Sequence, residues 1–175
     1  MERPNAWNAY DEEALAKLEE TARDYRDFLD NGKTERECAR RAIEMAKARG
    51  YRDLNDLVRE GTALKPGDKV YANCMDKAVM LFLLGSQPLE RGLNLLGAHI
   101  DAPRVDLKQN PLYEEGGMVY ADTHYYGGIK KYQWVALPLA LHGVVAKKDG
   151  TLVDLCIGED EKDPVVGISD LLIHL

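Results

Sequence analysis

The sequence predicts an α/β protein in which helices pack on a mixed sheet, followed by a β-rich segment. Two observations support this fold class. In the first half, apolar residues recur at intervals of three and four, as in amphipathic helices, and short apolar runs bounded by turn residues follow them. After Pro103 this periodicity gives way to alternating residues and to turn signals such as Asp149-Gly150.

Three helices are predicted within the first 60 residues. Asp11 can cap the first, and Thr34 with Glu37 forms a capping box for the second, so side chains would satisfy the free backbone N–H groups at both starts. Glycines are expected to close them: Gly32, Gly50 and Gly61. The expected buried face of the second helix is Cys38, Ala39, Ala42, Ile43, Met45 and Ala46.

Three strands are predicted next. Residues 69–73 and 78–84 would pair through a tight turn at Met75-Asp76-Lys77, after the turn at Pro66-Gly67-Asp68. Leu93, Leu95 and Leu96 form an apolar run bounded by turn residues, which predicts a buried central strand.

His99 and Asp101 directly follow this predicted central strand. Open α/β sheets bind ligands at the carboxyl ends of their strands. Residues two apart on an extended segment share a face, so Asp101 can accept one imidazole N–H of His99 and leave the other nitrogen for a metal. From residue types alone, a structural histidine remains the commoner interpretation.

The second half reads as strands at 104–108, 118–122 and 135–145, the last an edge or bulged strand because it contains Pro138. Breaks are expected at Asn110-Pro111 and at 114–117, a loop at 125–128, and a hairpin turn at Asp149-Gly150. A domain boundary near Pro103 to Pro111 divides the chain into segments 1–105 and 106–175. Ser169-Asp170 predicts a helix start, but only five residues follow it. An isolated helix of five residues is not stable in water, so the chain is expected to be a fragment.

Composition excludes several classes of protein. The formal net charge is −7, which argues against unspecific binding to nucleic acid or to an anionic membrane surface. No apolar run is long enough to span a bilayer, and no apolar signal region stands at the N-terminus. The three cysteines are widely spaced, so reduced thiols and a cytoplasmic location are expected.

Four segments together resemble the M18 family of metallo-aminopeptidases: Gly97–Arg104, Asn110–Tyr113, Thr123–Trp134 and Ile168–Leu175. The resemblance implies a zinc-exopeptidase domain that is split in sequence by an inserted β-rich dimerisation domain. Residues 1–105 would then be the first part of the catalytic domain, and residues 106–175 the beginning of the dimerisation domain. Residues 128–134 depart from the eukaryotic aspartyl branch, so a preference for acidic N-terminal residues is not carried over.

The resemblance also implies site residues and partners. His99 would be a metal ligand, Asp101 the carboxylate that orients it, and His174 a donor to the substrate carbonyl in a neighbouring subunit. The complete enzyme would hold two Zn²⁺ ions per subunit, or Mn²⁺ or Co²⁺, and would cleave one residue from a peptide with a free N-terminus. It would be a dimer-based homo-oligomer, up to a dodecamer. The other ligands and the general base have no counterpart here, so the 175 residues alone should be inactive.

The remaining candidate residues have plainer interpretations. His124, beside a Gly-Gly pair, is expected to be a loop or interface histidine, with a substrate-side role as the alternative, and His142 a structural one. The pair Lys130-Lys131 with nearby aromatic residues favours packing at a subunit contact over nucleic-acid stacking. Residues 160–163 are expected to form a solvated loop, because they lack calcium-loop spacing.

Two alternatives to the aminopeptidase stay open. A non-catalytic assembly or regulatory chain would keep the oligomerisation surface and bind no stoichiometric zinc. A different α/β hydrolase would use His99 and Asp101 as an acid–base pair, but no G-x-S-x-G nucleophile motif is present.

Overall fold

The computed structural model describes residues 3–170. The chain divides into two compact units, one up to Ile100 and one from Asp101 onward. The predicted domain limits, 1–105 and 106–175, follow from the split catalytic domain that the family resemblance implies. They stay a prediction. Each unit is described by itself below.

The helices of the first unit begin and end where the capping signals predicted. They are the 3₁₀ turn η1 (Ala6–Ala9), α1 (Glu12–Asp30), α2 (Glu35–Ala48) and α3 (Leu54–Glu60). Asp11 accepts a 2.8 Å hydrogen bond from the backbone N–H of Ala14, and both halves of the Thr34–Glu37 capping box are formed. Gly61 closes α3 with a φ of 64°, a left-handed conformation that glycine adopts without steric cost.

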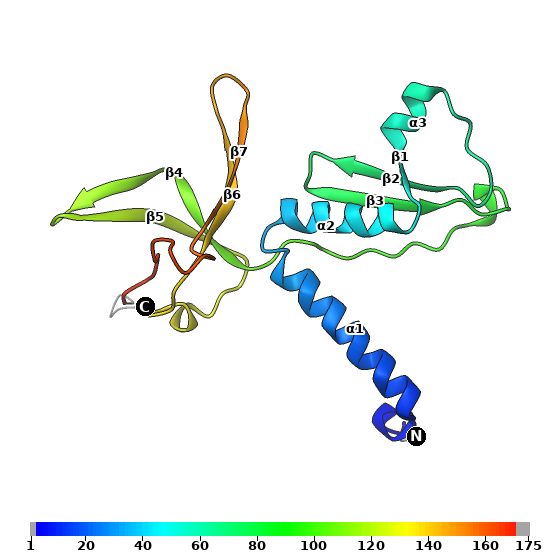
Figure 1. The fold of residues 1–175 in the computed structure, drawn as a ribbon, viewed down its shortest axis with the longest axis horizontal. Helices are drawn as coiled ribbons and strands as arrows, with labels where there is room; N and C mark the ends of the chain where they lie inside the picture. Colours follow the sequence, from blue (N-terminus) through cyan, green and yellow to red (C-terminus); the bar gives the residue numbers. More distant parts are fainter. Residues whose placement is uncertain (1–2, 171–175) are drawn as a thin grey trace. The chain divides into compact units, whose positions relative to one another are not determined.

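The sheet of this unit is mixed, as predicted. Its strands are β1 (Arg52–Asp53), β2 (Lys69–Cys74) and β3 (Ala78–Leu83), in the order β1-β2-β3. The first pair is parallel and the second antiparallel. Helix α2 runs beside the β2–β3 pair (Figure 1).

The core of the described chain lies between α2, α3 and β2. Its buried residues are Cys38, Ala39, Ala46, Leu57, Val70 and Tyr71. On α2 the prediction was therefore right for three residues. Ala42 and Ile43 are half-buried, and Met45 is exposed because it lies at the margin of the face that packs on the sheet. Helix α1 has the predicted apolar stripe, but none of its residues is buried by the described chain.

The prediction of a buried strand at Leu93, Leu95 and Leu96 was wrong for this structure. The segment has no regular secondary structure, and these side chains are 66%, 80% and 97% exposed. Apolar residues favour burial, but a strand exists only where a neighbouring strand pairs with its backbone N–H and C=O groups. No strand within residues 3–170 pairs with this segment.

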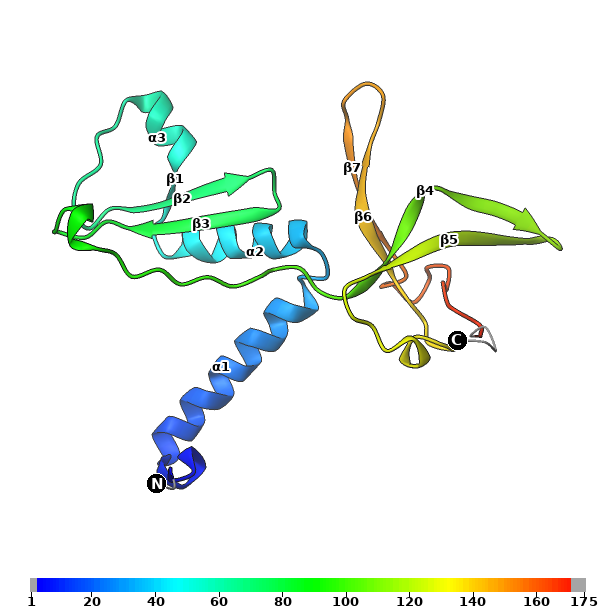
Figure 2. The ribbon, with the colours of Figure 1, turned by 180° about the vertical axis from the view of Figure 1, so that it is seen from behind.

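The second unit is built from two hairpins and connecting turns (Figure 2). Its elements are β4 (Arg104–Glu115), β5 (Met118–Tyr126), the 3₁₀ turn η3 (Lys131–Gln133), β6 (Leu141–Ala146) and β7 (Leu152–Ile157). β4 pairs with β5 and β6 with β7, both antiparallel. The turn predicted at Asp149-Gly150 joins β6 to β7, and Gly150 has a φ of 86°.

Three details of this unit differ from the prediction. β4 continues through Asn110-Pro111, because residues 108–111 form a bulge that tolerates a proline without an N–H group. Tyr125 and Tyr126 end β5 and do not belong to a loop. Of residues 135–145, only the part from Leu141 is a strand. The part before it makes isolated bridges to Val166 and Ile168. The helix predicted from Ser169 falls on residues 171–175, outside the described residues.

No helix within the described range 3–170 is long and apolar enough to span a membrane.

Candidate functional site

His99 lies in the irregular segment between the 3₁₀ turn η2 (Leu89–Arg91) and β4, and its side chain is exposed. The strand predicted before it is not formed. The neighbouring carboxylate is that of Asp101.

Asp101 is half-buried and receives a hydrogen bond from the end of β5. The phenol of Tyr126 donates from Oη to Oδ2 of Asp101 over 2.9 Å. A hydrogen bond to a charged oxygen is among the stronger kinds in proteins, so it restrains the rotation of the carboxylate.

Arg104 in turn holds Tyr126. The two residues are directly opposite in the β4–β5 ladder, and the guanidinium carbon lies 4.2 Å from the centre of the tyrosine ring. Arg104 Nε donates to Oδ1 of Asp106 over 2.7 Å, which fixes the guanidinium over the ring face. Cation–π contact and cross-strand pairing therefore both orient the phenol toward Asp101.

Gly127 lies beside Pro103 just beyond this pair. Gly127 has a φ of 73°, and a Cβ atom placed on it would lie 3.6 Å from Pro103. The two segments that carry most of the family resemblance, Gly97–Arg104 and Thr123–Trp134, thus meet at the base of the β4–β5 hairpin.

Sequence reasoning identified Asp101 but missed Tyr126 and Arg104. Both stand in motifs that the sequence singles out, yet their pairing depends on strand register, and the bulge shifts that register. Alternation alone placed Arg104 and Asp106 on one face, which the structure confirms.

The described residues do not form a complete metal site by themselves. Within residues 3–170, no group of three or more His, Cys, Asp or Glu side chains is placed to hold a metal ion. A catalytic zinc ion takes about three protein ligands. His99 would supply one such ligand, an imidazole on an exposed segment.

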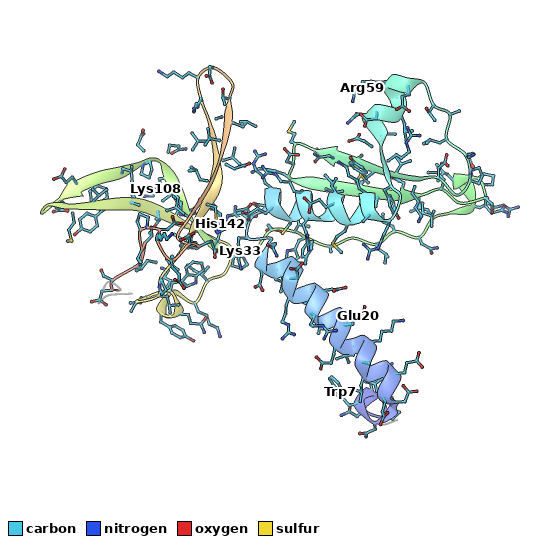
Figure 3. All side chains as sticks on the ribbon, viewed as in Figure 1. Trp7, Glu20, Lys33, Arg59, Lys108 and His142 are labelled. Carbon is cyan, nitrogen blue, oxygen red and sulfur yellow. The ribbon has the colours of Figure 1, made fainter. Side chains whose placement is uncertain are left out.

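The other histidines are placed as follows. His174 lies outside the described residues. His124 was expected in a loop or at an interface. It does not lie in a loop, because β5 continues to Tyr126; its ring stacks on Tyr125 with centroids 5.1 Å apart. An interface role stays a prediction. His142, at the start of β6 (Figure 3), has Nε2 3.0 Å from Oε1 of Glu159. This contact agrees with a structural role for His142.

Lys131 and the aromatic residues near it contact residues of the same unit. The ammonium group of Lys131 lies 5.3 Å from the centre of the Tyr125 ring, and Trp134 lines a pocket of about 300 Å³ with Val105 and Ile129. Tyr132 of the same segment is 65% exposed. Packing at a subunit contact stays a prediction.

Along the chain, a His-x-Asp segment follows an α/β unit and precedes a β-rich unit, which is the order of parts that the M18 resemblance implies. Comparison with known families agrees: residues 28–175 match the family described as aminopeptidase I zinc metalloprotease (M18). The chain therefore belongs to the M18 family.

Individual relatives support this assignment. The chain is 54% identical, over 99% of its length, to a protein named as a probable M18 family aminopeptidase 1 in Clostridium acetobutylicum, and 41% identical to the one so named in Thermotoga maritima. It spans 37% of the length of each.

Solved structures show the same fold. Aminopeptidase I from Borrelia burgdorferi B31 superposes with a TM-score of 0.88 at 39% identity, covering 97% of this chain and 41% of that one. Aminopeptidase I from C. acetobutylicum gives 0.83 at 54% identity, covering 100% and 38%. The S. cerevisiae mApe1 dodecamer shares the fold at 23% identity, with a TM-score of 0.71 and coverage of 89% and 36%.

Proposed function

We propose that this chain is part of a zinc-dependent aminopeptidase that removes the N-terminal residue from peptides. The observation that carries the proposal is the match of residues 28–175 to a zinc metalloprotease family. The chain spans 37% of its relatives' length, so the activity belongs to the whole protein, and the 175 residues alone are expected to be inactive.

Each named residue has a defined task in this proposal. His99 contributes one imidazole ligand, Asp101 accepts the second N–H of that ring, and His174 donates to the substrate carbonyl in a neighbouring subunit. The 2.9 Å hydrogen bond from Tyr126 to Oδ2 of Asp101 restrains this carboxylate, which supports its task. Two bound Zn²⁺ ions, or Mn²⁺ or Co²⁺, would polarise the scissile carbonyl and lower the pKa of a bound water.

The proposed assembly is a homo-oligomer built from dimers, in the cytoplasm. The structure of S. cerevisiae mApe1 is that of a dodecamer, and its fold matches 89% of the present chain. The second unit offers exposed apolar side chains near the tip of the β4–β5 hairpin, among them Leu112, Met118 and Val119. Apolar side chains gathered on an exposed hairpin are typical of contacts between subunits.

Metal analysis of His99→Ala in the purified full-length protein tests this function. The wild type is expected to carry two zinc ions per subunit and to cleave unblocked peptides, and His99→Ala to lose metal and activity. His124→Ala is the matched control, because His124 is another exposed histidine but stacks on Tyr125 within β5. Full activity with both metals in His99→Ala would contradict the assignment.

The same measurement separates the alternative function. An assembly or regulatory chain predicts a wild-type oligomer without stoichiometric zinc and without peptidase activity. That result would contradict the aminopeptidase proposal and support a non-catalytic assembly or regulatory chain.

A further inference from the structure

We propose that Asn31 is a deamidation site, and that the Asp27 carboxylate, held by Arg41, slows its reaction while the protein is folded. Asn31-Gly32 is the one Asn-Gly pair in the sequence, and it lies in the turn between α1 and α2 (Figure 1). Deamidation through a cyclic imide is fastest at such a pair, because glycine has no side chain to hinder the attack and its backbone is the most flexible. The inference does not depend on the proposed function.

The reaction at Asn31 needs only water as a co-reactant. The backbone nitrogen of Gly32 attacks the side-chain carbonyl carbon Cγ of Asn31 and loses its proton. The Cγ–Nδ2 bond breaks, and Nδ2 leaves as ammonia. Water then adds to either carbonyl carbon of the imide and opens the ring. The product is aspartate, or isoaspartate, in which the main chain runs through Cβ and Cγ. Asn31 is exposed, so water reaches it.

The backbone at the end of α1 holds the attacking nitrogen away from its target. Asn31 caps α1 with a ψ of 4°, which places the Gly32 nitrogen nearly eclipsed with the backbone nitrogen of Asn31 and away from its Cβ. The N–H of Gly32 donates to the carbonyl oxygen of Leu29 over 3.4 Å. Attack requires rotation about the Cα–C bond of Asn31, which breaks this hydrogen bond. The folded backbone therefore disfavours imide formation.

The side chain of Asn31 is restrained as well. Its Nδ2 donates to the carbonyl oxygen of Asp27 over 2.8 Å and to Oδ1 of the same residue over 3.2 Å. Oδ2 of Asp27 pairs with the guanidinium of Arg41, which belongs to α2. A hydrogen bond to a charged oxygen is stronger than one between neutral groups. Arg41 thus fixes the carboxylate that holds the asparagine amide, and these bonds must open before Cγ can turn toward Gly32.

Glycine is required at position 32 by close packing. A Cβ atom there would lie 2.9 Å from Sγ of Cys38 and 2.9 Å from the carbonyl oxygen of Phe28. Because one of these atoms belongs to the backbone, a larger residue would displace the turn. The junction between α1 and α2 thus depends on the residue that makes Asn31 reactive.

Deamidation would reverse the interaction at the end of α1. The amide that donates to Asp27 becomes a carboxylate, which cannot donate and repels the Asp27 carboxylate one helical turn before it. A negative charge at the C-terminus of a helix also interacts unfavourably with the helix dipole. The modification would therefore weaken the last turn of α1 and its ion pair with Arg41.

Incubation of the full-length protein at mildly alkaline pH tests the proposal. Peptide mass spectrometry measures the fraction of Asn31 converted over time, with the same protein in urea as the unprotected reference. We expect conversion in the folded wild type to be about 10-fold slower than in urea, because the hydrogen bonds around Asn31 must open first.

Arg41→Met isolates the role of the ion pair. The substitution removes the guanidinium that holds Asp27 and keeps an unbranched apolar stem. Arg36→Met is the matched control, because Arg36 is another arginine of α2 and its ion pair, over 3.9 Å, is with Asp76. We expect conversion of Asn31 to be about 2- to 5-fold faster in Arg41→Met than in the wild type, and within about 1.5-fold of the wild type in Arg36→Met.

Three results would overturn the inference. No conversion in urea would mean that Asn31 is not reactive, and equal rates in urea and in the folded wild type would mean that the fold does not protect it. Equal rates in Arg41→Met and the wild type, or in the two Met variants, would mean that the ion pair does not set the rate.

Circular dichroism at the incubation temperature shows which variants are folded. If Arg41→Met is not, added salt gives a second test in the wild type, because salt screens an exposed ion pair. The rate at Asn31, relative to that in urea at the same salt concentration, should then rise with salt. A relative rate that does not change with salt would overturn the role of Arg41.

Discussion

Replacing Gly158 by alanine should destabilise the second unit more than any other glycine replacement in its β6–β7 hairpin. Gly158 follows β7 with a φ of 103°, where side chains are rarely found. A Cβ atom there would lie 2.9 Å from the carbonyl oxygen of Leu139 and 3.1 Å from the Cα atom of Ala140. Both are backbone atoms, so the contact can be relieved only by moving the backbone, either at Gly158 or in the segment that leads into β6.

The expected loss has two parts. A positive φ costs a non-glycine residue about 1–2 kcal/mol. Forcing an added methyl against fixed atoms costs about 1–3 kcal/mol, so Gly158→Ala should lose about 2–5 kcal/mol in free energy of unfolding. Gly150→Ala has the same backbone conformation, with a φ of 86°, but no atom within 4 Å of the added Cβ, and should lose only the first part. Gly143→Ala has neither feature and should change stability little.

Urea unfolding monitored by far-UV circular dichroism gives the three free energies, and hydrogen exchange of peptides covering 139–158 reports the hairpin itself. The reasoning requires the order Gly143→Ala, Gly150→Ala, Gly158→Ala in increasing loss. Equal losses for Gly150→Ala and Gly158→Ala would refute it, since the contact with Leu139 would then cost nothing.

Two further predictions concern the first unit. Thr34→Ala removes the side chain that accepts from the N–H of Glu37 and should lower the free energy of unfolding by about 1 kcal/mol, whereas Thr34→Ser should keep most of it; equal urea midpoints for the two variants would contradict this. Burial, followed by the charge of Glu37, raises the pKa of the Cys38 thiol above its ordinary value of 9.0. Cys38 should therefore be alkylated more slowly than exposed Cys74, as peptide mass spectrometry would show. The folded state holds the thiol proton of Cys38 more tightly than the unfolded state does. The protonated thiol therefore contributes fully to the free energy of unfolding below the ordinary pKa, and this contribution is lost as the pH rises above it. A urea midpoint that rises through this pH range would contradict the shift.

The parts of the fold that could be predicted are those fixed by residues close in sequence. The Asp11 cap and the Thr34–Glu37 box each span four residues, and the Asp149-Gly150 turn joins neighbouring strands. In each case the atoms that satisfy the backbone belong to the same short segment. Composition and spacing therefore contain the necessary information.

The parts that could not be predicted depend on distant partners. Tyr126 contacts Asp101, which lies 25 positions earlier in the sequence. The bulge in β4 changes the strand register, and its length cannot be counted from the sequence. The apolar run at Leu93 to Leu96 signals a preference for burial but does not contain its own neighbour. For the candidate site, the sequence could thus name His99 and Asp101 but not the group that holds the carboxylate.

The bulge in β4 divides the β4–β5 hairpin into two ladders, one at the base and one at the tip, and the pairing register differs between them. Leu107 pairs with Thr123 and Leu112 with Ala121, so four residues, 108–111, stand opposite Asp122 alone. In an uninterrupted ladder, a one-residue insertion reverses the facing of every later side chain. Here such a change at the tip can be absorbed by the bulge, while Arg104 and Tyr126 at the base keep their pairing. The outer half can therefore diverge among related proteins, in length and in surface, without disturbing the carboxylate at Asp101.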